Sequence, residues 1–126
     1  MGKFRKIGIF VWVVLFCFGA GGAYPGEETG QSEIKFLINH LSTVNAEFVR
    51  NGKIYSCQDG YQHIIKKYKY FAKKNKIVDG KSFIKYAATK SLISNKPYFL
   101  IVDENPVELS RYLSDLLLRF QSEVLE

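Results

Sequence analysis

Apolar residues recur at helical spacing in four stretches of this chain, and the first two stretches follow candidate helix starts. Ser32 is a candidate N-cap for the first helix. Asp59 is a candidate N-cap for the second, with Gln62 completing a capping box three residues later. We therefore predict two amphipathic helices. The apolar positions are Ile34, Leu37, Ile38, Leu41 and Val44 in the first, and Tyr61, Ile64, Ile65, Tyr68, Phe71 and Ala72 in the second.

The third and fourth helices have clearer boundary signals. Asp79 can cap the third, and Pro97 forbids its continuation beyond Asn95, a residue that tolerates a left-handed backbone. Asn105 and Pro106 provide an N-cap and a proline at the first helical position, followed by Glu108 at N3, so we predict a fourth helix from there. We expect the inward residues to be Phe83, Ile84, Ala87, Ala88 and Leu92 in the third helix, and Leu109, Tyr112, Leu113, Leu116, Leu117 and Phe120 in the fourth.

Two shorter stretches have the pattern of β-strands. Asn51-Gly52 accepts the positive φ angles of a type I′ turn, and its flanks favour strands, so we predict a hairpin over 48–55. The apolar run 98–102 is too short for a helix and predicts a buried strand. The sum is a single compact α+β domain over 32–126, with about four helices, a small hairpin and one late strand. Residues 24–31 are rich in glycine and polar residues, and we expect a flexible lead-in there.

The first 23 residues have the order of a secretory signal peptide. Three basic residues fall within the first six, residues 7–18 are apolar, and residues 19–23 are small. Gly21 and Ala23 supply the small side chains needed before a cleavage site, so we predict cleavage after Ala23. The alternative is an uncleaved membrane anchor, but residues 7–23 are at the short limit for a bilayer span. We therefore expect a periplasmic or secreted protein with no stable membrane span after cleavage.

Removal of the leader changes the charge. The chain has 126 residues and a net charge of +6, whereas residues 24–126 carry only +3. That charge is divided into −2 over 24–60, +9 over 61–102 and −4 over 103–126. A hydrophobic content of 47% excludes disorder as the main description. Cys57 is the only cysteine after cleavage, which excludes an internal disulfide, and we expect an inert structural thiol.

The basic middle third contains a candidate binding face. On a helical wheel, His63, Lys67, Tyr70 and Lys74 fall opposite the apolar stripe of the second helix. A histidine and a tyrosine among lysines can bind phosphate or carboxylate groups. The alternative is that these lysines only solvate the outer faces of two helices. Nucleic acid is not the expected partner, because an exported protein meets its partner outside the cytoplasm.

Signatures of catalysis are scarce. The sequence has no glycine-rich phosphate loop, no nucleophile elbow and no histidine pair at metal-ligand spacing, so we expect no cofactor and no metal. An enzyme is the less favoured alternative. It would be a small cell-envelope hydrolase or transferase that uses His63 as general base with Ser91 or Ser94 nearby. A thiolate–imidazole pair of Cys57 and His63 lacks an evident third orienting group.

Several short segments occur in a familiar order. They are Phe48-Val49-Arg50-Asn51-Gly52, Tyr55, His63, Lys67-Tyr68, Phe83-Ile84, Ser91 and Ser94-Asn95-Lys96-Pro97-Tyr98. At this separation they resemble the domain-of-unknown-function family 5329, a group of small exported proteins of Gram-negative bacteria, over roughly residues 33–120. The resemblance implies no activity. It points to Arg50, Asn51, His63, Lys67, Ser91 and Ser94 as the polar members of the pattern.

The resemblance also implies a difference in this chain. The family carries one cysteine before the hairpin and another at the end of the late strand, and here those positions correspond to Ala46 and Val102. If the two cysteines form a disulfide, this chain has lost both members together and depends on its core for stability. Asn95 stands where the family has glycine, and asparagine also adopts the left-handed conformation.

These observations favour a non-enzymatic exported domain that binds an anionic envelope component or a protein partner. The candidate contact residues are Arg50, Asn51, His63, Lys67, Tyr70, Lys74, Ser91 and Ser94.

Overall fold

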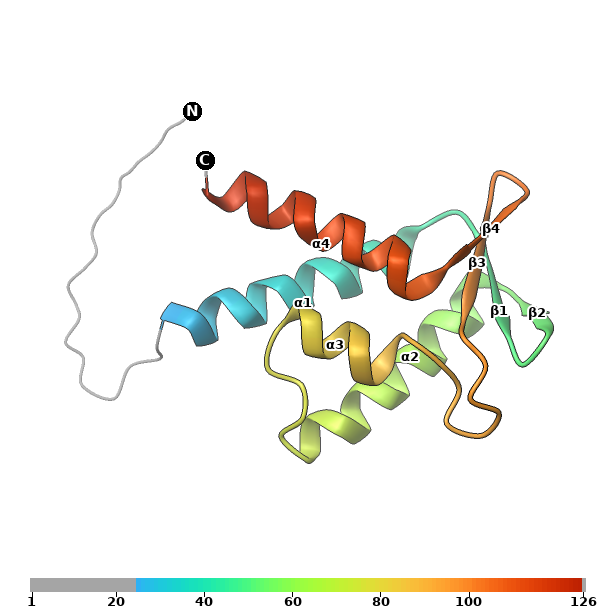
Figure 1. Ribbon diagram of the computed structural model, residues 1–126, viewed down its shortest axis with the longest axis horizontal. Coiled ribbons are helices and arrows are strands. Elements are labelled where there is room, and N and C mark those ends of the chain that lie inside the picture. The colour runs from blue at the N-terminus through green and yellow to red at the C-terminus, as the bar shows by residue number, and fades with distance from the viewer. Residues whose placement is uncertain (1–24, 126) are drawn as a thin grey trace.

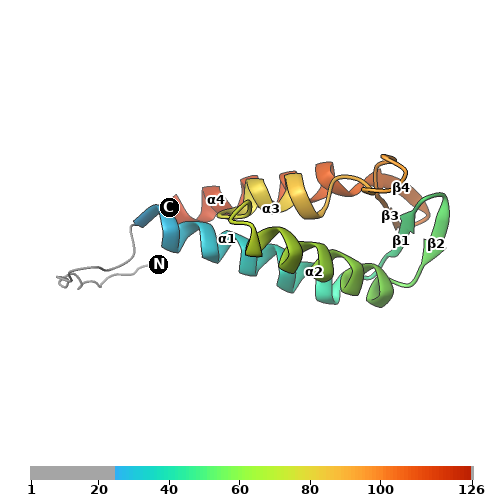
Figure 2. The same cartoon turned by 90° about the horizontal axis from the view of Figure 1, so that it is seen from below.

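The computed structural model describes residues 25–125, so the predicted signal peptide lies outside the described part of the chain. Four helices lie side by side, and a small sheet lies at one end of them (Figure 1). Seen from below, α1 and α2 form one layer and α3 and α4 the other (Figure 2). This arrangement confirms the predicted α+β class. The elements are α1 (Pro25–Thr43), β1 (Glu47–Arg50), β2 (Lys53–Tyr55), α2 (Cys57–Lys73), α3 (Gly80–Ala87), β3 (Phe99–Val102), β4 (Asn105–Glu108) and α4 (Leu109–Leu125).

The sheet is antiparallel and has the order β2-β1-β3-β4. The predicted hairpin is confirmed: Asn51 and Gly52 join β1 to β2 with φ angles of 55° and 77°. One row of paired residues crosses all four strands and packs against the helical core. That row consists of Tyr55, Phe48, Leu100 and Val107.

The predicted start of the fourth helix is wrong. Residues 105–108 form β4, which pairs with β3 in the register Ile101↔Pro106, and α4 begins only at Leu109. The reason is that the apolar run of β3 offers a pairing edge immediately before the turn. Pro106 is tolerated because β4 is an edge strand, where a missing N–H costs little.

The predicted lead-in over 24–31 also needs correction, because α1 begins at Pro25 and Ser32 lies inside it. Gly30, which suggested flexibility, is buried against the connection between α2 and α3. A Cβ atom at Gly30 would lie 2.2 Å from the backbone oxygen of Val78. The glycine therefore permits close packing of α1 in this place.

The helix α2 begins three residues earlier than predicted, at Cys57. Its N-cap is Ser56, whose Oγ accepts from the Asp59 amide at 3.1 Å, so the predicted Asp59–Gln62 capping box is wrong. Gly60 is buried within the first turns of α2. A Cβ atom there would lie 2.3 Å from Cγ of Phe48, so glycine allows the helix to lie directly against the sheet.

The start of α3 was predicted correctly. Asp79 accepts from the Ser82 amide at 2.9 Å in a capping box. The helix ends at Ala87, earlier than expected, so Leu92 does not continue its buried face. Leu92 is instead 64% exposed, which corrects its assignment to the core. Asn95 has the expected positive φ of 65°, but it closes a turn in the loop between α3 and β3.

The core lies between the two helical layers and extends under the sheet. Its largest fully buried side chains are Tyr98, Phe83, Ile34, Leu37, Ile64, Leu100, Leu109 and Leu113. Among the helices of residues 25–125, none combines the length and the apolar character needed to cross a membrane.

Candidate functional site

Lys67 on α2 has a buried charged side chain. Helical periodicity placed it on the polar face, yet only 8% of it is exposed, because residues 90 and 98 pack over it. Its Nζ donates to the backbone oxygen of Lys90 at 2.7 Å and to the hydroxyl of Tyr98 at 3.1 Å. Both acceptors are neutral, and a buried charge without an opposite charge is energetically costly.

Tyr98 connects Lys67 to His63. Its side chain is fully buried, and its hydroxyl lies 2.9 Å from Nε2 of His63. An ammonium group can only donate, so the hydroxyl accepts from Lys67 and directs its own proton to the histidine. This direction requires a neutral imidazole with its proton on Nδ1. The three side chains therefore form one polarised chain of hydrogen bonds from ammonium to imidazole.

The pKa values agree with this arrangement. Burial, then the positive charges of Arg50, Lys67 and Lys66, lower the pKa of His63 to about 4, so the imidazole is neutral at pH 7. Burial lowers the pKa of Lys67 to about 8. Burial also raises the pKa of Tyr98 to about 12, which keeps its proton in place. These three side chains, Lys67, Tyr98 and His63, are called the cluster below. At pH 7 its positive charge is on Lys67, and Tyr98 and His63 are neutral.

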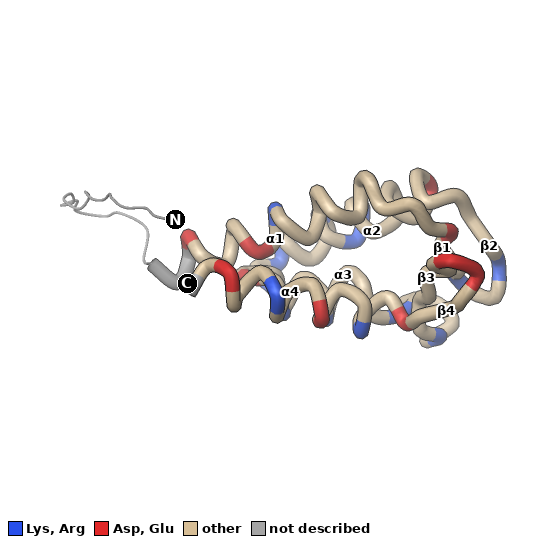
Figure 3. Tube along the Cα trace, turned by 90° about the horizontal axis from the view of Figure 1, so that it is seen from above, with Lys and Arg blue, Asp and Glu red and all other residues tan. Residues whose placement is uncertain are grey.

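Two neighbouring hollows open beside this cluster and share His63 and Lys66. The smaller, about 250 Å³, also has Lys67, Tyr70 and Leu92 in its lining. The larger, about 440 Å³, is lined by Asp59, Gln62, His63, Ile65, Lys66 and Lys69. In the linings of both hollows bases outnumber acids. The acids of residues 103–125 lie along α4 and by β4 (Figure 3). The hollows are suited in charge to an anionic group.

The loop of residues 88–98 forms one side of the smaller hollow and is held by hydrogen bonds. The Ser91 amide donates to the Lys96 oxygen, and the Asn95 amide donates to the Ser91 oxygen, each at 2.9 Å. Oγ of Ser91 accepts from the amides of Ile93 and Ser94 at 3.2 and 3.3 Å. The Ser94 hydroxyl donates to the Asn51 side chain, which ties the loop to the hairpin turn.

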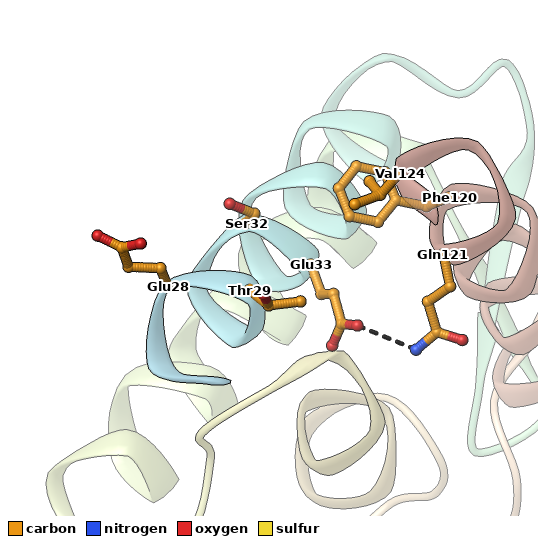
Figure 4. Close-up of a pocket in the computed structure, with 7 residues that line it drawn as sticks. All are labelled: Glu28, Thr29, Ser32, Glu33, Phe120, Gln121 and Val124. Atoms are coloured by element: carbon orange, nitrogen blue, oxygen red, sulfur yellow. Dashed lines mark hydrogen bonds between the residues drawn. The ribbon is translucent and has the colours of Figure 1, made fainter. Parts of the chain in front are cut away.

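A further hollow, about 500 Å³, lies between α1 and α4, and no candidate residue lines it (Figure 4). Its buried carboxylate, Glu33, already has two partners. Oε1 accepts from the Gly80 amide at 3.0 Å, and Oε2 accepts from Nε2 of Gln121 at 2.9 Å. Glu33 thus joins three helices and caps α3, which is a structural role.

A model of the Family of unknown function (DUF5329) matches residues 28–121 of the chain. The protein belongs to the DUF5329 family. This confirms the resemblance found in the sequence. No curated protein and no solved structure matches the chain.

In this DUF5329 protein, the predicted site residues fall into two groups. The first group lies around the cluster: His63 and Lys67 belong to it, and Tyr70 borders the smaller hollow. Lys74, at the end of α2, has its ammonium 4.8 Å from the centroid of the Tyr70 ring. Arg50 ends β1 and acts on His63 through its charge.

The second group consists of Asn51, Ser91 and Ser94, which shape the hairpin turn and the loop. Each of the three makes a side-chain hydrogen bond within the loop or between the loop and the hairpin turn. They hold the loop of residues 88–98 beside the cluster, and they do not themselves border either hollow.

The enzymatic alternative required a serine beside His63, but the partner of His63 is Tyr98. The Cys57–His63 pair is likewise not formed. Sγ of Cys57 lies 3.6 Å from the Leu41 backbone oxygen, and burial raises the pKa of the thiol. Among residues 25–125, no group of three or more His, Cys, Asp or Glu side chains is placed to hold a metal ion.

Sequence reasoning missed Tyr98 and Lys66. Tyr98 belongs to the predicted apolar strand and to one family segment, but neither gave it a role in the site, although a buried tyrosine usually needs a hydrogen-bond partner for its hydroxyl. That requirement was the available signal. Lys66 gave none, because its importance comes from the hollows beside it.

Proposed function

We propose that this DUF5329 protein is an exported, non-enzymatic binding module that captures an anionic component of the cell envelope. The face around His63, Lys66 and Lys67 makes the contact. The observation that carries the proposal is the buried Lys67 ammonium, which has neutral partners only. Burial is the cause of its lowered pKa, with no contribution from a neighbouring carboxylate.

An anion in the smaller hollow would supply the missing opposite charge. Phosphate and carboxylate groups accept charge-assisted hydrogen bonds from ammonium groups, and these bonds are stronger than neutral ones. Lys66 borders both hollows, so it can add a second, exposed ammonium to the same anion. The predicted leader is the reason for proposing that this binding occurs in the periplasm or outside the cell.

The test uses pyrophosphate as the probe, followed by NMR shifts of backbone amides. We expect the shifted amides to lie in α2 and in the loop of residues 88–98. Binding should weaken strongly toward about 1 M salt, where the screening length falls to about 3 Å. The double variant Lys66→Glu/Lys69→Glu should lose binding, because both side chains are exposed and line the larger hollow.

The matched control is Lys35→Glu/Arg111→Glu, with one substitution on α1 and one on α4. It changes the net charge by the same amount as Lys66→Glu/Lys69→Glu. Those two side chains are exposed and line neither of the hollows beside His63. The control should retain binding. Equal loss in both double variants, or binding that does not depend on salt, would reject a specific anionic face.

A further inference from the structure

The loop between α3 and β3 presents two adjacent aliphatic side chains to solvent. Ile93 is 89% exposed and Leu92 is 64% exposed. Isolated apolar residues on a surface are common. Here, however, the two stand together at the outer end of a turn whose amides and carbonyls are bonded internally. The turn therefore holds Leu92 and Ile93, called the aliphatic tip below, in place before any partner binds.

Positive charge surrounds this tip. Lys90 and Lys96 flank it along the chain, both exposed, and their segments are joined by a bridge between Lys90 and Pro97. On the side of α2, Leu92 shares the smaller hollow with Lys66 and Tyr70. Tyr70 is 52% exposed. The tip is thus an apolar point within a basic, aromatic surface.

The acids are placed elsewhere or already bonded. Between residues 61 and 102 the only acid is Asp79, whose carboxylate accepts from the Ser82 amide at the start of α3. Asp59 borders the larger hollow, not the smaller one that contains Leu92. The approach of a negatively charged surface to the tip therefore meets lysines first.

We propose that the loop of residues 88–98 docks this protein on an anionic lipid bilayer, with Ile93 and Leu92 entering the acyl boundary. Lys66, Lys90 and Lys96 contact lipid phosphates. This inference rests on the proposed function and names the envelope component as a lipid surface. Two aliphatic side chains give weak partition alone, and basic residues near an anionic surface add to it, so binding requires both. Tyr70 is suited to the headgroup level, where aromatic side chains with a polar end are enriched.

The test expresses the full chain and purifies the protein as cells accumulate it, after any removal of the leader. The protein is then mixed with vesicles of phosphatidylglycerol or of phosphatidylcholine. Wild-type protein should sediment with the anionic vesicles and not with the zwitterionic ones. Ile93→Ser should reduce the partition by about tenfold, because it removes a nearly fully exposed aliphatic group from the contact. Leu118→Ser is the matched control, since Leu118 on α4 is 63% exposed, and it should leave partition unchanged.

A second measurement locates the tip. The chain has one tryptophan, Trp12, and it lies in the predicted leader. In a Trp12→Phe background, Ile93→Trp therefore gives a single indole on the loop whether or not the leader is removed. Brominated acyl chains in anionic vesicles should quench its fluorescence. The same indole introduced by Leu118→Trp should not be quenched.

The outcomes separate this inference from the proposed function. Ile93→Ser should bind pyrophosphate like the wild type, because Ile93 borders neither hollow. If pyrophosphate binds but vesicles do not, the lipid inference is overturned and the anionic face remains, with a soluble or protein partner. Equal partition of Ile93→Ser and wild type overturns insertion of the tip. If neither pyrophosphate nor vesicles bind, both proposals fail.

Discussion

Acidification should destabilise the fold specifically through His63. In the folded protein the neutral imidazole of His63 accepts a hydrogen bond from the Tyr98 hydroxyl, and that hydroxyl in turn accepts one from the Lys67 ammonium. Protonation turns Nε2 into a donor, so the Tyr98 hydroxyl would then face two cationic donors and lose its acceptor. The folded state therefore resists protonation, whereas the unfolded chain accepts it freely.

The size of the effect follows from the pKa of His63, which falls from its ordinary value of 6.5 to about 4. Between these pH values the unfolded state holds a proton that the folded state lacks, so stability present above pH 6.5 is lost as the pH falls to 4. The two pKa values differ by about 2.5, and each pKa unit corresponds to about 1.4 kcal/mol, so the loss in the free energy of unfolding is at most about 3.4 kcal/mol. His63 is partly exposed, and screening by solvent reduces the expected loss to about 1–2 kcal/mol.

The assay is urea unfolding followed by circular dichroism at pH 7 and pH 4.5, in the wild type and in His63→Gln. The glutamine oxygen can accept from Tyr98 and does not titrate, so the variant should lose about 1–2 kcal/mol less between the two pH values. His40→Gln is the matched control because Nε2 of His40 lies 2.8 Å from the Tyr112 hydroxyl in a second histidine–tyrosine pair. Burial, then Arg119, lower the pKa of His40 as well, but no buried lysine adjoins that pair.

An equal loss of stability in wild type and His63→Gln would refute the reasoning. It would mean that the imidazole is not held neutral by the cluster. A larger effect in His40→Gln than in His63→Gln would assign the acid sensitivity to the pair between α1 and α4 instead.

Two further predictions concern the packing of the sheet. Gly60→Ala should lower the free energy of unfolding in urea, because overpacking against Phe48 costs about 1–3 kcal/mol and outweighs the gain of up to about 1 kcal/mol in helix propensity. Unchanged stability would show that the Phe48 ring moves aside. The β1–β3 register, extended by one pair, sets Ala46 opposite Val102, so Ala46→Cys/Val102→Cys should oxidise to a disulfide. In a Cys57→Ser background this should remove both free thiols and stabilise the fold by about 2–4 kcal/mol, whereas persistent thiols would contradict the register.

The elements that were predicted correctly are those that neighbouring residues determine. Asn51-Gly52 favours one tight turn because both residues accept positive φ, and that preference needs no distant contact. Asp79 with Ser82 is a similar case at the start of α3. In each, the stabilising hydrogen bond or backbone preference lies within three residues of the signal.

The elements that were missed depend on distant partners. Residues 105–108 resemble a helix start, yet pairing with β3 overrides that local preference. Lys67 falls on the polar side of a helical wheel, and its burial arises only because Lys90 and Tyr98 fold over it. Gly30 and Gly60 suggested flexible or capping positions, but each lies where another backbone or ring comes too close for a side chain. A single sequence shows a glycine without showing what packs against it.

The strand order β2-β1-β3-β4 also has a consequence for how the chain reaches its fold. Each outer strand pairs with a neighbour across a short turn, so the two hairpins can form early and independently. The central pairing of β1 with β3 joins Glu47 to Ile101 and closes a loop that contains all of α2 and α3. Contacts between residues so distant in sequence form slowly, because the chain entropy lost on closing the loop comes before the stabilising contacts. We therefore expect the rate-limiting step of folding to be the joining of the two hairpins on a partly assembled helical layer.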